Sequence, residues 1–146
     1  MRKKGILQAS VELEVPFFDV DMMNIVWHGH YVKYFEMARC ALLDKIGHNY
    51  NQMRECGYGW PVVDLQLRYV QPAFGQKIVV TADLVEWQER LKINYLISDV
   101  ASGERLTRGT TVQVAVRIAD REMQFVAPVE FRDAVETAIA RESLRK

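Results

Sequence analysis

Hydrophobic and polar side chains alternate along the first segment of the chain, from Leu7 to Phe18. Successive side chains of a strand point to opposite faces, so apolar residues of one parity share a face. We therefore predict a half-buried strand that ends at Pro16 or soon after. The apolar residues of this parity are Leu7, Ala9, Val11, Leu13 and Val15.

A helical pattern begins at Tyr31, where apolar residues recur at steps of four, three, four and four. This spacing places them on one stripe of an α-helix, and Gly47 is expected to end that helix as its C-cap. A short helix and a turn are predicted for residues 48–59. The apolar stripe consists of Tyr31, Phe35, Ala38, Leu42 and Ile46.

Strand-like alternation returns in the second half of the chain, with short turns between the runs. After them, a tail from Pro128 carries apolar residues at helical spacing. This order of elements predicts an α+β fold in which one long helix is wrapped by a curved antiparallel sheet. Exposed edge strands of such a sheet favour pairing across a twofold axis, so we expect at least a dimer. The predicted strands cover residues 63–69, 78–87, 91–97 and 106–118.

The sequence has 146 residues, of which 49% are hydrophobic and 26% are charged, and this suits one globular domain spanning residues 1–146. Nineteen basic residues balance nineteen acidic ones, which argues against binding to nucleic acid or to an anionic membrane surface. No membrane span and no export signal are expected, because no long apolar run occurs, and we predict a cytoplasmic protein. Cys40 and Cys56 lack the spacing of a metal site and are expected to be free thiols.

Two acidic residues, Asp19 and Asp21, precede the long helix and lie two positions apart. In an extended segment their side chains would point the same way, and paired carboxylates can divide acid and base roles. Alternatively, one of them caps the helix, because Asp is favoured just before a helix N-terminus. The residue types alone leave both interpretations open.

The start of the long helix is the second candidate for chemistry. Its first N–H groups, near Trp27, His28 and Gly29, would form an anion-binding end directed at developing negative charge. Gly29 would let a substrate approach the backbone closely. His28 and His30 diverge on a helix and lack a third ligand, so no metal is expected, and His48 is expected to be solvated.

Other arrangements of catalytic groups are not indicated. Glu36 and Arg39 stand three positions apart on the long helix, which predicts an ion pair within that helix. The sequence contains no GxSxG elbow, no GxGxxG loop and no GxxxxGK[ST] loop. We therefore expect neither a serine nucleophile nor a nucleotide or redox cofactor.

Two segments resemble the hotdog-fold 4-hydroxybenzoyl-CoA thioesterase family, especially its bacterial branch of small acyl-CoA thioesterases. Residues 17–39 read FFDVDMMNIVWHGHYVKYFEMAR, and residues 68–76 read RYVQPAFGQ and are similar to the family's Tyr-x-x-Pro-Ala segment. Together with the order of strands, the resemblance extends from about residue 11 to residue 126. It implies a hotdog fold with sites at a dimer interface, an acyl-CoA or acyl-carrier-protein substrate, and a homodimer or homotetramer.

The resemblance also implies roles for individual residues. Asp21, the second acid of the pair, matches the family's catalytic carboxylate, which acts as a base or as a nucleophile. His28 matches the position whose backbone N–H polarises the thioester carbonyl. An acyl pocket is expected close to Trp27 and to the residues Met22, Met23, Asn24 and Trp60.

The sequence departs from the family's pattern at two places, and two other functions stay open. The Met-Met-Asn segment after Asp21 is bulkier than the Ala-Gly-Gly or Pro-Ala-Gly of close relatives, and Phe17 stands where some relatives have a tyrosine. One alternative is a hotdog hydratase or dehydratase of acyl thioesters, with His28 and Glu36 as its catalytic pair. The other is a non-catalytic module that binds acyl-CoA.

Overall fold

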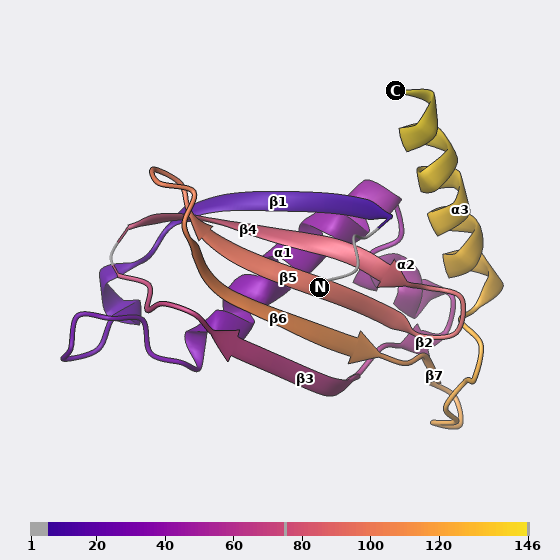
Figure 1. Cartoon of the computed structure of the whole chain (residues 1–146). Helices are drawn as coiled ribbons and strands as arrows, with labels where there is room; N and C mark the ends of the chain where they lie inside the picture. The colour runs from indigo at the N-terminus through magenta and orange to yellow at the C-terminus, as the bar shows by residue number, and fades with distance from the viewer. Residues whose placement is uncertain (1–5, 75, 146) are drawn as a thin grey trace.

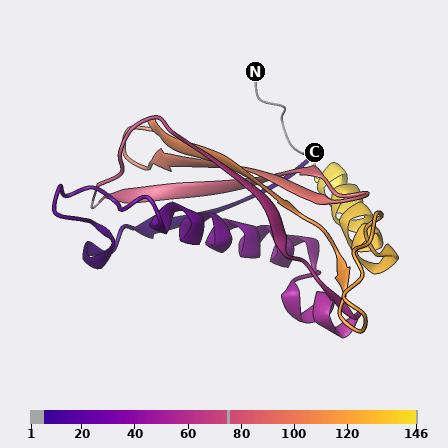
Figure 2. The ribbon, with the colours of Figure 1, turned by 90° about the horizontal axis from the view of Figure 1, so that it is seen from below.

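The computed structural model describes residues 6–74 and 76–145, in which a curved antiparallel sheet wraps around a long central helix, α1 (His30–Ile46) (Figures 1 and 2). The strand order in this sheet is β1-β4-β5-β6-β3. Its strands are β1 (Leu7–Glu14), β3 (Val62–Tyr69), β4 (Lys77–Glu86), β5 (Leu91–Asp99) and β6 (Arg105–Gln113). The remaining elements are η1 (Phe17–Asp19), α2 (Tyr50–Glu55), β2 (Tyr58–Gly59), β7 (Val116–Arg117) and α3 (Val129–Leu144).

Helix α1 lies along the concave face of the sheet (Figure 2), and the residues of the predicted apolar stripe are buried. The ring of Phe35 stacks on Tyr95 of β5 with centroids 4.5 Å apart. Gly47 ends the helix in the left-handed conformation, with φ of 85°, and its N–H donates to the carbonyls of Leu43 and Asp44. The predicted helix, its buried stripe and its C-cap are thus confirmed.

The predicted strand 106–118 is divided in the structure, because β6 ends at Gln113 and a separate strand, β7, follows. Polar residues of β6 face the core with partners: the hydroxyls of Thr111 and Tyr95 are hydrogen-bonded at 2.8 Å. The side-chain amide of Gln113 donates to the carbonyl of Trp60 at 2.6 Å. Polar groups are stable in a core when they are hydrogen-bonded. The alternation of apolar residues alone therefore does not identify the buried face of this strand.

Strand β3 forms one edge of the sheet and is far more exposed than its alternating sequence predicts. Val63 and Leu65 are 57% and 41% exposed. Within the described residues, β3 pairs only with β6, so its other side presents backbone groups that nothing covers. An apolar edge strand of this kind is a template for a further strand.

The expectation that His48 is solvated is wrong. Its side chain is buried between α1 and α3, and its ring meets Phe131 edge to face. Cys40 and Cys56 are free thiols, as predicted. No helix in the part of the chain that the structure describes has the length and apolar character needed to cross a membrane.

Candidate active site

A tight loop connects η1 to helix α1 and carries most of the residues singled out in the sequence. Val20 and Val26 form an antiparallel bridge, and the Asp21 N–H donates to the Ile25 carbonyl at 2.8 Å. At the tip, Asn24 has a positive φ of 62°, a conformation that asparagine tolerates better than most residues. The loop therefore folds back on itself before α1 begins.

Asp21, Trp27 and His28 line one pocket of about 290 Å³ at the N-terminal end of α1. The Asp21 carboxylate is exposed, and its Oδ1 accepts from the backbone N–H of Met23 at 2.8 Å. A longer bond of 3.4 Å reaches the same oxygen from Ile25. Oδ2 accepts no hydrogen bond from the described residues, so one oxygen is held by the loop and the other is available for chemistry.

The opposite wall of this pocket comes from residues 69–72, at the end of β3. The carbonyl of Ala73 accepts from the Val26 N–H at 2.8 Å, and the Ala73 N–H donates to the Tyr31 hydroxyl at 3.2 Å. The rings of Tyr31 and Tyr69 meet edge to face at 5.2 Å. Tyr31 and Tyr69 are not among the site residues predicted from the sequence. The segment 68–76 is the sequence feature that could have predicted this wall.

The helix start provides N–H groups, but fewer than predicted. The Trp27 N–H donates to the Asp19 carbonyl at 3.1 Å, so Trp27 is not a free donor and that part of the prediction is wrong. Among the described hydrogen bonds, none uses the backbone N–H of His28 or Gly29. These two donors stand at the positive end of the α1 dipole.

A glycine is needed at position 29 for a structural reason, in addition to any contact with substrate. A Cβ atom at this position would collide with the six-membered ring of Trp27. The indole also contacts the rings of His28 and His30, at centroid distances of 4.9 and 5.3 Å. In this chain, therefore, the group that approaches the backbone of Gly29 closely is Trp27.

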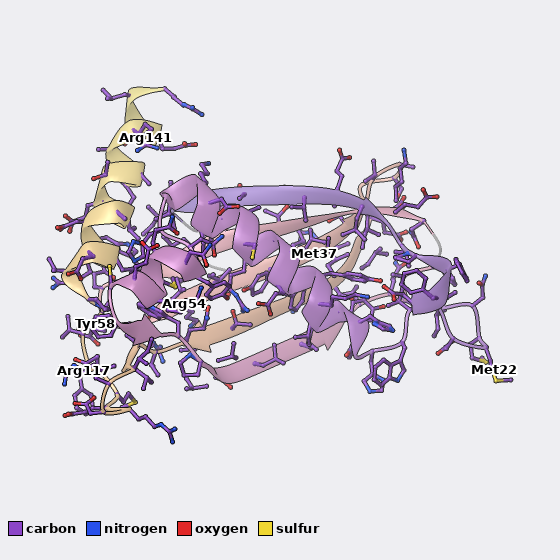
Figure 3. The ribbon with its side chains drawn as sticks, turned by 180° about the vertical axis from the view of Figure 1, so that it is seen from behind. Met22, Met37, Arg54, Tyr58, Arg117 and Arg141 are labelled. Atoms are coloured by element: carbon purple, nitrogen blue, oxygen red, sulfur yellow. The ribbon has the colours of Figure 1, made fainter. Side chains whose placement is uncertain are left out.

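The four residues expected to line an acyl pocket do not line this one within the chain. Met22 and Met23 project into solvent from the loop tip, as Figure 3 shows for Met22. Asn24 occupies the turn itself, and Trp60 is buried against Phe131, among residues near α2 and α3. The tip residues are directed outward by the tight turn, whereas Trp60 is apolar enough to join the core.

Asp19 and Asp21 do not form a carboxylate pair. Asp19 is only 1% exposed, and its Oδ2 accepts from the Tyr34 hydroxyl at 2.6 Å and from Lys33 Nζ at 2.8 Å. Burial alone would raise the pKa of the Asp19 carboxyl, but these hydrogen bonds and the charges of His30 and Lys33 hold it below its ordinary value. Helix α1 has no side-chain cap either, so neither interpretation of the acidic pair describes its geometry.

Glu36 and Arg39 form the predicted ion pair within α1, with 2.8 Å between Oε1 and Nη2. Arg39 is buried, and its Nε donates to the Tyr50 hydroxyl at 2.7 Å. Glu36 does not line the pocket that contains His28. Among residues 6–74 and 76–145, no three His, Cys, Asp or Glu side chains gather as a metal site would require.

Comparison with known families decides the class of the protein, because the model of the thioesterase-like superfamily matches residues 15–139. The chain belongs to the thioesterase-like superfamily. YneP of Bacillus subtilis (strain 168), a protein named as a candidate acyl-CoA thioesterase, is 31% identical over 125 residues, which are 84% of this chain and 86% of YneP. The thioester-hydrolase class predicted from the sequence is confirmed.

Solved structures confirm the hotdog fold. The DHNA-CoA thioesterase of Staphylococcus aureus superimposes with a TM-score of 0.80 and 25% identity, covering 95% of each chain. The hypothetical protein TT1821 of Thermus thermophilus gives a TM-score of 0.78 and 26% identity, covering 89% of this thioesterase and 98% of its own chain. The pocket described above is therefore the candidate active site of a thioesterase.

Proposed function

We propose that this thioesterase hydrolyses acyl-CoA thioesters, with Asp21 as the catalytic carboxylate. The observation that carries the proposal is the position of Asp21 in a pocket that also contains the start of α1. One carboxylate oxygen is held by the loop backbone, and the other accepts no hydrogen bond from the described residues. A fixed acid with a free oxygen, in one pocket with His28, suits attack on a carbonyl.

The backbone N–H groups of His28 and Gly29 serve as donors to the thioester oxygen in this proposal. Negative charge develops on that oxygen as the carbonyl is attacked, and one positioned donor is typically worth about 3 to 4 kcal/mol. The positive end of the α1 dipole adds to the effect without a charged side chain. The helix start therefore supplies stabilisation where the reaction needs it.

Asp21 can act by either of two routes. As a general base, it takes a proton from water, whose oxygen then adds to the carbonyl and displaces the thiolate. As a nucleophile, it forms an anhydride with the acyl group, and water opens that anhydride. Both routes give the free acid and the thiol, and we assign to His28 a hydrogen bond to the carboxylate or to the departing thiolate.

The two alternatives receive less support. A hydratase or dehydratase would need His28 and Glu36 in one site, but the Glu36 carboxylate is paired with Arg39 and does not line the His28 pocket. A module that only binds acyl-CoA would not need an acid with a free oxygen at the carbonyl. Hydrolysis is the activity that uses Asp21, His28 and the helix N–H groups together.

The test is thiol release from a panel of short-chain, long-chain and aromatic acyl-CoAs, with absorbance for enoyl formation recorded in parallel. We expect Asp21→Asn to lower the rate of hydrolysis by about a hundred- to ten-thousand-fold, the usual contribution of a base or nucleophile. Asp120→Asn is the matched control, because Asp120 is an exposed carboxylate paired with Arg117. Arg117 lies at the opposite end of the molecule from Met22, as Figure 3 shows.

Full hydrolysis by Asp21→Asn would contradict the assignment of Asp21. Enoyl formation without thiol release would replace hydrolysis by the hydratase reaction. Binding of acyl-CoA with neither reaction would favour the non-catalytic module.

A further inference from the structure

The most deeply buried charged cluster near the pocket surrounds Asp19, which the hydrolytic chemistry above does not use. Its Oδ2 accepts two hydrogen bonds from α1, donated by Lys33 and Tyr34. Its Oδ1 is buried without a hydrogen bond from the described residues, and His30 Nδ1 lies 3.7 Å from it. The carboxylate thus connects η1, which precedes the loop that carries Asp21, to the first two turns of α1.

The backbone of Asp19 makes a second connection, in this case to the far end of the same loop. Its carbonyl accepts from the Trp27 N–H at 3.1 Å, and its own N–H donates to the Pro16 carbonyl at 2.9 Å. Trp27 directly precedes His28 and Gly29, whose N–H groups are the proposed donors to the substrate. The backbone of Asp19 therefore holds the residue that directly precedes those two donors.

A buried carboxylate is costly to desolvate, and a hydrogen-bonded network offsets that cost only when its geometry is good. Such a group is stable in one arrangement of its partners, here Lys33 and Tyr34. The loop between residues 19 and 29 is otherwise short of core contacts at its tip, where Met22 and Met23 are exposed. An anchor at its base adds to the Val20–Val26 bridge and to the Val26–Ala73 hydrogen bond, which also hold the loop that carries Asp21.

We propose that Asp19 is a positioning residue for thioester hydrolysis, because its side chain holds the start of α1 and its backbone holds Trp27, so that Asp21 and the donors of His28 and Gly29 face one another. This inference rests on the proposed function of the pocket. Asp19 does not touch the substrate and is not a catalytic residue. Supporting groups of this kind keep reacting groups within a fraction of an ångström of the productive geometry.

The test compares Asp19→Asn with the wild-type full-length chain. Asparagine keeps the volume and one accepting oxygen, but it removes the negative charge that pairs with Lys33. We expect kcat to fall by about ten- to a hundred-fold, because small displacements of reacting groups are costly. KM for the same acyl-CoA should change less than threefold, because Asp19 lies outside the pocket.

Amide hydrogen exchange gives a readout that is independent of activity. We expect residues 20–29 to exchange at least tenfold faster in Asp19→Asn, while β4 and β5 stay unchanged. Tyr34→Phe keeps the ring and the pair between Asp19 and Lys33 but loses the 2.6 Å hydrogen bond, so smaller effects in the same direction are expected. This variant keeps the test available if Asp19→Asn does not fold.

Asp99→Asn is the matched control. Asp99 also accepts several hydrogen bonds, from Ser102 in the turn between β5 and β6 and from Gln76 directly before β4. The Asp99 variant should keep the wild-type kcat. An equal loss of kcat in this variant would reduce the role of Asp19 to general stability and overturn the proposal.

Two further outcomes separate this inference from the proposed function. A normal kcat in Asp19→Asn, with Asp21→Asn inactive, overturns the role of Asp19 and leaves the function intact. If the wild type hydrolyses none of the acyl-CoAs, the proposed function fails, and unchanged exchange of residues 20–29 in Asp19→Asn then overturns the anchoring role as well.

Discussion

Side chains of the same type occupy opposite environments in this thioesterase, and the difference between Asp19 and Asp21 is a difference of burial. Asp19 is enclosed and accepts hydrogen bonds from α1, whereas Asp21 is exposed at the pocket and accepts them from its own loop. An enclosed ion is stable only with its partners, while an exposed one can change its partners during a reaction. In the proposed mechanism, therefore, Asp19 has the structural role and Asp21 the chemical one.

His48 carries a prediction about pH at the same scale. Burial lowers the pKa of its imidazole, although the nearby charge of Glu130 opposes the shift. As the pH falls, the unfolded chain therefore binds a proton at His48 from about pH 6.5 downward, whereas the folded chain does so only at a lower pH. Stability that is fully present above that pH should be lost as the pH falls through the range between the two pKa values.

Urea unfolding at pH 7.5 and pH 5.5 checks this prediction. The midpoint of the wild type should fall on acidification, and His48→Gln should show a smaller fall, whatever its stability at pH 7.5. An equal fall in both proteins would show that His48 does not contribute to acid sensitivity.

Among the elements, β6 shows how closely α1 packs on the sheet. A Cβ atom at Gly109 would lie 2.5 Å from the ring of Phe35 and 2.7 Å from the backbone oxygen of Gln66. A glycine is therefore required at this position of the strand, because the ring of Phe35 from α1 lies against its backbone. The stacking of Phe35 on Tyr95 depends on that close approach.

Gly109→Ala should destabilise the protein by about 1 to 3 kcal/mol, the usual cost of inserting atoms into a packed core. Urea unfolding measures the change, and Gly59→Ala is the control, because a Cβ atom there meets nothing within 4 Å. Equal stability of Gly109→Ala and the wild type would mean that α1 moves away from β6 at little cost.

For the whole molecule, the exposed edge strand β3 makes a second copy of the chain the expected neighbour. Antiparallel pairing of β3 with its own copy would satisfy its open backbone groups and cover Val63 and Leu65. The pocket lies at one end of this strand, since residues 69–72 form one of its walls. We therefore keep the expectation of at least a dimer as a prediction.

Sedimentation equilibrium tests this expectation on the full chain, whose monomer mass is 16.9 kDa. We expect a mass of twice this value or more, and a rise of about tenfold or more in the dissociation constant of Leu65→Lys, which corresponds to about 1.4 kcal/mol. Val100→Lys is the control, because Val100 is also exposed but lies in the turn after β5. A monomeric wild type would contradict the prediction, as would equal dissociation of the two variants.

The amino-acid sequence by itself determined the features that depend on near neighbours. The period of apolar residues gave β1 and α1, Gly47 marked the end of that helix, and the segment 17–39 contained both Asp21 and His28. These two residues share a pocket because a short loop limits how far apart they can lie. Local spacing was sufficient for this part of the site.

Only the tertiary structure decided the features that depend on distant segments. It brought residues 69–72 to the pocket as its second wall, buried Asp19 instead of Asp21, and placed Trp60 in the core and Met22 in solvent. Burial and hydrogen-bond partners arise from contacts between elements far apart in the chain, as at His48. The same alternating pattern therefore describes a covered strand such as β5 and an uncovered one such as β3, and only packing against neighbours distinguishes them.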